Sequence, residues 1–209
     1  MKSYACITAA TCMLLASCAA DRGGDIRLAA LGARRIVLER PMLEGVHADL
    51  GNEHGFWFSD VPLATLAAAR PEEPVESAVI VHAQMVWQPE PGRTPLSATA
   101  TNTVLRVLVI SKGEVGIYGG AGFARPLGML DDETLEIEVR GGTLTLLEST
   151  KGFHDLMSPA DITGVLKARK SVEAVLQWRR GASQFAANAI GKPMWVGSGA
   201  PRAILSLRE

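Results

Sequence analysis

The chain has 209 residues, with 21 Lys and Arg against 22 Asp and Glu, so its formal net charge is -1. Hydrophobic residues make up 47% and charged residues 21% of the sequence, which excludes disordered, collagen-like and multi-span membrane proteins. The charge balance also argues against a nucleic-acid-binding domain, because such domains are usually clearly basic.

The N-terminus has the pattern of an export signal. Met1-Lys2-Ser3 is basic, and the thirteen residues from Tyr4 to Ala16 carry no charge. A run of this length is too short to span a bilayer, but it suits the apolar segment of a signal peptide. The run ends in Leu15-Ala16-Ser17-Cys18, which resembles the lipobox of bacterial lipoproteins.

The resemblance implies a signal peptide over residues 1–17 and lipidation of Cys18, which becomes the first residue of the mature chain. Acyl chains such as palmitate on this cysteine anchor such proteins to a membrane of the cell envelope. Ala19 follows the cysteine, and by analogy a Gram-negative cell sends such a protein to the outer membrane, facing the periplasm. The alternative is ordinary secretory cleavage near Ser17-Cys18-Ala19-Ala20.

We expect residues 18–27 to form the lipidated cysteine and a flexible tether, and residues 28–209 to form a single domain. All three cysteines lie in the first 18 residues, so the domain has no internal disulfide and depends on its core alone.

The first two thirds of the domain predict mainly strands. A run over 33–39 is ambiguous between strand and helix, and a short helix is expected over 61–69. The clearest strand places Val79, Val81 and Ala83 on one face and His82 on the other. The expected strands cover 78–88, 104–111 and 114–118, and Lys112-Gly113 makes a tight turn between the last two.

Residues 134–147 alternate between apolar and polar on both sides of Gly141-Gly142. Two glycines suit the positive-φ turns of a hairpin, so the pattern predicts two paired strands in which Val139 faces Leu144.

The chain is predicted to become helical at Ser158-Pro159, where a serine cap precedes a proline at the first helical position. Apolar residues then recur at helical spacing, with a break near Ser171, until Gly191 ends the helix. A last edge strand is expected over 203–207. The fold class is therefore α+β: a mostly antiparallel sheet within about 33–150, followed by C-terminal helices over about 158–190 packed on one face.

Common catalytic motifs are absent from the sequence. There is no G-x-S-x-G elbow, no S-x-x-K pattern, no H-E-x-x-H, no P-loop and no G-x-G-x-x-G. Cysteine catalysis is excluded because the mature chain keeps only Cys18.

A polar cluster is the main candidate for chemistry. His47 and Asp49 project to one side of a strand, and His54 lies beyond a probable Gly51-Asn52 turn that folds it back toward them. His82 would supply a third imidazole. Histidine and carboxylate side chains are the usual ligands of zinc and related metals, but this spacing matches no defined motif. The alternative is that these are ordinary loop and sheet polar groups.

Aromatic and glycine-rich segments give a second candidate, a binding surface. Trp57 is flanked by a polar loop and is the best candidate for an exposed tryptophan, and Tyr118 precedes three glycines. The glycines over 119–122 suit either a bent strand that packs closely or a nest of amides that binds an anion. His154-Asp155 has the form of a base with its orienting carboxylate, although such pairs are common by chance.

Five cations near the C-terminus form a possible contact with anionic lipid headgroups, or simply a solvated helix face. They are Lys167, Arg169, Lys170, Arg179 and Arg180.

Three functions remain open, and none involves nucleic acid. The leading hypothesis is a non-catalytic accessory or binding module on the envelope that recruits another envelope protein or a glycan. The second is a metal-dependent periplasmic hydrolase that uses His47, Asp49, His54 and His82. The third is a purely structural envelope lipoprotein.

Overall fold

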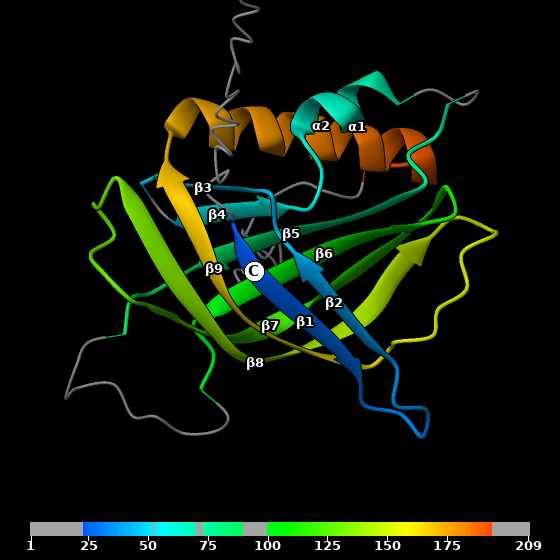
Figure 1. Cartoon of the computed structure of the whole chain (residues 1–209), viewed down its shortest axis with the longest axis horizontal. Helices are drawn as coiled ribbons and strands as arrows, with labels where there is room; N and C mark the ends of the chain where they lie inside the picture. Colours follow the sequence, from blue (N-terminus) through cyan, green and yellow to red (C-terminus); the bar gives the residue numbers. More distant parts are fainter. Residues whose placement is uncertain (1–22, 52, 70–72, 90–99, 194–209) are drawn as a thin grey trace, which may run out of the picture.

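The computed structural model describes residues 23–51, 53–69, 73–89 and 100–193. The signal peptide, Cys18 and the strand expected over 203–207 therefore lie outside the described residues. Within them the chain forms nine strands and two helices (Figure 1). In chain order these are β1 (Gly24–Ala30), β2 (Val37–Pro41), β3 (Glu44–Asp49), β4 (His54–Ser59), α1 (Leu63–Ala68), β5 (Ser77–Met85), β6 (Thr103–Ser111), β7 (Glu114–Pro126), β8 (Thr134–Ser149), β9 (Ala160–Lys170) and α2 (Val172–Ile190).

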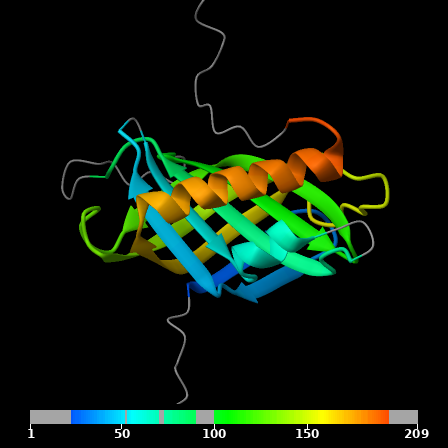
Figure 2. The same cartoon turned by 90° about the horizontal axis from the view of Figure 1, so that it is seen from above.

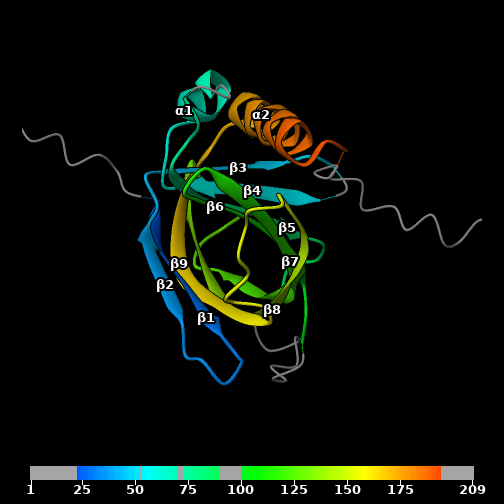
Figure 3. The same ribbon diagram turned by 90° about the vertical axis from the view of Figure 1, so that its right-hand side faces the viewer.

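The strands form one sheet that closes on itself. Their order is β2-β1-β9-β3-β4-β5-β6-β7-β8, and β8 pairs in addition with β9. One edge of β9 bonds β8, while its other edge bonds β1 first and then β3 at Arg169 and Lys170. The strands β3 to β9 thus make a ring, seen end on in Figure 3, and β1 and β2 form a ribbon beside it.

The β3–β9 contact is parallel and every other pairing is antiparallel. The predicted α+β class, a mostly antiparallel sheet with helix packed on one face, is confirmed.

Both helices lie outside the ring, over β3 and β4 (Figures 2 and 3). The Ser171 hydroxyl caps α2 by accepting a hydrogen bond from the Ala174 amide at 3.2 Å, and Gly191 ends the helix with φ of 79°. The apolar stripe of α2 recurs every three or four residues and faces the sheet: it consists of Val175, Trp178, Ala182 and Ala186. Among the described residues, neither helix is long and apolar enough to cross a membrane.

The closed sheet separates two apolar layers, one inside the ring and one between the ring and α2. Side chains of β4 point alternately into the two apolar layers. Phe56 and Phe58 lie in the layer inside the ring, and Trp57 lies in the layer between the ring and α2. The alternation predicted for β5 is confirmed, because Val79 and Val81 point inward.

Several local predictions are also confirmed. The short helix expected over 61–69 is α1, and the ambiguous run over 33–39 ends in strand β2. Lys112 and Gly113 form the turn between β6 and β7 with φ of 54° and 77°.

The prediction of a helix from residue 158 is wrong, because residues 160–170 form β9. Alternate residues of this segment point into the ring, and the helical reading of Ile162, Val165 and Leu166 overlooked that period of two. Long-range pairing with β8, β1 and β3 overrides the local helical pattern. The break expected near Ser171 is the boundary between β9 and α2.

The predicted hairpin over 134–147 is also wrong, because β8 is one strand of 16 residues. Val139 pairs with Ala124 and Gly164, whereas Leu144 pairs with Gly120 and Ala160. Gly141, with φ of 65°, forms a bulge that bends β8 instead of reversing it. β7 and β9 are long enough to pair with both halves of β8.

The expectation that the flexible segment extends to residue 27 is wrong. Residues 24–27, which we expected in a flexible segment, belong to β1 and pair with both β2 and β9. The alternation of Ile26 and Leu28, both buried, with polar Arg27 is too short a pattern to stand out in the sequence.

The glycines over 119–122 lie within β7 and serve close packing, as the bent-strand interpretation proposed. A Cβ atom added at Gly120 would lie 1.8 Å from the carbonyl oxygen of Thr143 on β8. Strand pairing at this point therefore needs a residue without a side chain.

We expect Gly120→Ala to lower the free energy of unfolding by about 1–3 kcal/mol or more, because the β7–β8 backbone must shift. Gly32→Ala is the matched control, because nothing lies within 4 Å of its added Cβ. Urea unfolding of both variants measures the difference, and equal stability would contradict the close packing.

Candidate functional site

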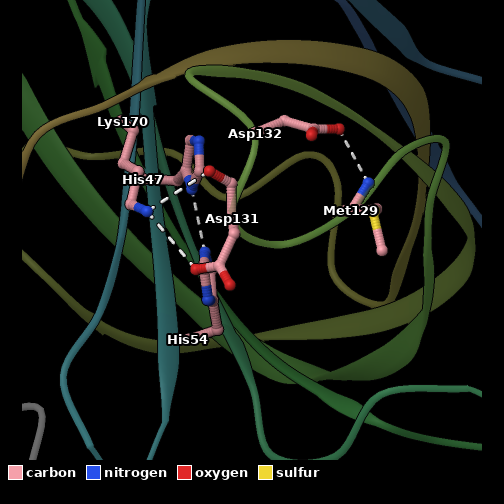
Figure 4. Close-up of polar contacts among 6 residues, drawn as sticks. All are labelled: His47, His54, Met129, Asp131, Asp132 and Lys170. Carbon is pink, nitrogen blue, oxygen red and sulfur yellow. Dashed lines mark hydrogen bonds and ion pairs between the residues drawn. The ribbon is translucent and has the colours of Figure 1, made fainter.

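Two polar side chains meet inside one end of the ring, as the sequence predicted. His47 on β3 and His54 on β4 both point inward, because the turn after Asp49 brings the two strands into register. The Nδ1 atom of His47 and the Nε2 atom of His54 are 2.9 Å apart, and the rings stack at 5.1 Å between centroids (Figure 4).

The histidine pair is enclosed. His47 is fully buried and His54 is 6% exposed, and the Phe56 ring lies against both. Beside them Lys170 donates to the carboxylate and the carbonyl oxygen of Asp131, at 3.3 Å each (Figure 4). This contact ties the end of β9 to the β7–β8 connection, which covers the pair.

Burial keeps both imidazoles neutral. Desolvation lowers the pKa of His47, and desolvation together with the neighbouring His47 lowers the pKa of His54 to about 4. In a neutral pair one ring donates and the other accepts, so the bond at 2.9 Å fixes complementary tautomers. No hydrogen-bond partner for the buried Nε2 atom of His47 is found among the described residues, although the backbone of Asp132 lies close enough to raise the pKa of His47 against the effect of burial.

The other members of the predicted cluster do not join this pair. His82 projects to the outer face, where it stacks on Trp57 at 4.4 Å, and burial lowers its pKa to about 3. Asp49 is exposed and accepts a hydrogen bond from the Gly51 amide. Among the described residues no group of three or more His, Cys, Asp or Glu side chains is placed to hold a metal ion. The set of His47, Asp49, His54 and His82 is therefore not one site.

The expected exposure of the candidate binding surface is wrong, because Trp57 is 1% and Tyr118 3% exposed. Tyr118 nevertheless contributes to the lining of a cavity at the opposite end of the ring. Trp57 packs between His82 and Trp178 of α2. Its polar neighbours lie in the turn between β3 and β4, whereas the residue itself points toward the helix.

The remaining candidate groups, the His154-Asp155 pair and the five cations, are not arranged as the sequence predicted. The Asp155 carboxylate accepts hydrogen bonds from the Tyr118 hydroxyl at 2.8 Å and from the amides of Met157 and Ser158, so it orders a loop instead of orienting His154. The five cations do not share a helix: Lys167, Arg169 and Lys170 belong to β9, and only the other two lie on α2.

A cavity opens at the other end of the ring, and sequence reasoning missed it. It has a volume of about 630 Å³ and lies between β2, the start of β5, the β6–β7 turn with the start of β7, and the β8–β9 connection. Its apolar walls are part of the interior core or pack against it. They are formed by Ile36, Leu38, Val79, Val109, Phe153 and Met157.

The mouth of this cavity combines apolar and charged side chains. Val37 and Leu156 line it and are 44% and 56% exposed. The charged groups at the mouth are Arg40, Lys112 and Glu114. No local motif marks the cavity, because its walls come from four separate segments. The apolar run over 33–39, Tyr118 and His154 all stand out in the sequence and all contribute to the lining, but nothing in the sequence shows that they converge.

No protein-family model, no curated protein and no solved structure matches this chain.

The neutral histidines predict a loss of stability in acid. An unfolded histidine takes up a proton near pH 6.5, whereas His54 in the folded chain does so only near pH 4. Between these values the unfolded state binds more protons, so stability falls as the pH falls. At pH 5 we expect His54 to account for a loss of about 2 kcal/mol relative to pH 7.5.

Urea unfolding at both pH values tests this expectation. His54→Gln should lose less stability than the wild type on acidification, and the exposed His154→Gln should lose as much as the wild type. Equal losses in all three proteins would contradict the assignment to His54.

Proposed function

We propose that this protein is an envelope-anchored, non-catalytic binding module that takes an apolar ligand in the cavity at the β2 end of the ring. The observation that carries the proposal is the cavity itself. Its volume of about 630 Å³ lies within the range of small-molecule sites, about 300–1,000 Å³, and its walls are mainly apolar.

The exposed side chains at the mouth support a ligand that stays partly outside. Exposed Val37 and Leu156 flank an opening whose inner wall is the core. An apolar ligand seated there removes both surfaces from water, which stabilises the complex by about 25 cal/mol per Å² of apolar area.

Binding is favoured over catalysis because the histidine pair is remote from this cavity. His47 and His54 lie beside the ends of β3 and β9, whereas the cavity lies at the starts of β5 and β7. At neutral pH an imidazole with a pKa of about 4 is a weak base.

The neutral apolar dye N-phenyl-1-naphthylamine tests the cavity in purified protein. We expect its fluorescence to rise on binding, and Leu156→Asp to weaken binding at least about tenfold, because the ligand would desolvate an unpaired carboxylate. Val165→Asp is the control, since Val165 is also exposed, at 47%, but lies outside the cavity. No dye binding, or equal weakening by both variants, would overturn the proposal.

The anchor is the second part of the proposal and depends on the lipobox-like sequence Leu15-Ala16-Ser17-Cys18. We expect the wild-type protein to partition with membranes and to incorporate labelled palmitate. Cys18→Ala should abolish labelling and move mature protein to the soluble fraction. Labelling that survives the substitution would contradict lipidation at Cys18.

A further inference from the structure

The cavity has an apolar interior and a charged mouth, and the two together specify more than an apolar ligand. Val79, Val109 and Met157 line the inside with hydrocarbon. A ligand that fills this interior but reaches the mouth must therefore end in a polar group.

The charges at the mouth favour one sign. Among the residues that line the cavity, Arg40 and Lys112 are positive and Glu114 is negative, while the Asp60 carboxylate outside the lining partly offsets the charge of Arg40. The Glu114 carboxylate already accepts a hydrogen bond from the Thr150 hydroxyl. Arg40 is held in place by a hydrogen bond to the Ser77 hydroxyl at 2.8 Å, and the Asp60 carboxylate lies 3.9 Å from its Nε atom.

The backbone fixes where the Lys112 side chain starts. Lys112 has a positive φ of 54°, a conformation that non-glycine residues adopt rarely, in the tight turn between β6 and β7. The turn places the exposed Lys112 at the mouth of the cavity, next to Ser111, which pairs with Ser77 on β5. Arg40 belongs to β2, so the two cations border the mouth from different elements.

We infer that the ligand is a single-chain anionic amphiphile, a carboxylate of the fatty-acid type, with its tail against the apolar walls and its carboxylate between Arg40 and Lys112. The inference rests on the proposed function. A cavity of about 630 Å³ suits one ligand of drug-like size, and hence one chain rather than a two-chain lipid. Arginine and lysine both form strong charge-assisted hydrogen bonds to carboxylates.

Displacement of N-phenyl-1-naphthylamine by ligands with the same tail tests the inference. The ligands are dodecanoate, dodecanol and dodecyltrimethylammonium, added to purified protein in detergent-free buffer at low salt. We expect dodecanoate to bind at least about tenfold more tightly than the ammonium compound, because charged hydrogen bonds form only with the carboxylate. Added salt should reduce this preference.

Two substitutions test whether Lys112 and Arg40 cause the preference for the carboxylate ligand. Lys112→Asn removes the charge with a residue that tolerates positive φ, and Arg40→Gln removes the other charge. The double variant should lose the preference for dodecanoate, because neither cation remains to pair with its carboxylate and the Glu114 carboxylate stays at the mouth. Its affinity for dodecanol should not change. Arg27→Gln, which removes a charge from β1 outside the cavity, should keep the full preference.

The outcomes separate this inference from the proposed function. If the dye does not bind, the cavity is not a ligand site and both fail. If the dye binds but the carboxylate has no advantage, or keeps its advantage in the double variant, the cavity remains a binding site and the anionic ligand is wrong. Thermal unfolding of each variant confirms that it is folded, and Lys112→Asn alone should give part of the loss.

Discussion

The pairing of β9 is the constraint on which the rest of the structure depends. This strand bonds β8 along one edge, and β1 and then β3 along the other, so that a linear sheet becomes a ring. Closure gives the sheet an inside and an outside, each with its own apolar layer. It also pairs the edges of β3 and β8 with β9. In an open sheet these edges would be exposed and unpaired.

The two ends of the ring differ because of what covers them. At one end Lys170 and Asp131 join β9 to the β7–β8 connection, and the neutral pair of His47 and His54 lies beneath it. At the other end the β8–β9 connection lines a cavity and is ordered by the Asp155 carboxylate. One end is thus filled by two polar side chains that share a hydrogen bond, while the other leaves core residues accessible to a ligand.

Whether a feature of this fold can be predicted from the sequence depends on how far apart along the chain its interacting residues lie. The alternation of β5, the Lys112-Gly113 turn and the approach of His54 to His47 depend on neighbouring residues, and the sequence predicts them. β9 is a strand, and β8 is one continuous strand, because both pair with strands that lie far away along the chain. The patterns at 158–170 and at Gly141-Gly142 fit helix and hairpin equally well until those partners are known. The cavity is harder still, because it exists only where separate segments fail to fill the interior.

The attachment of β2 has a consequence for the width of the cavity. β2 pairs with β1 alone, whereas the opposite wall belongs to the ring. Side-chain contacts such as the hydrogen bond from Arg40 to Ser77 join β2 to the ring, whereas its strand pairing is with β1. On the β2 side, the dimension across the cavity is therefore set by side-chain packing and not by strand pairing with the ring.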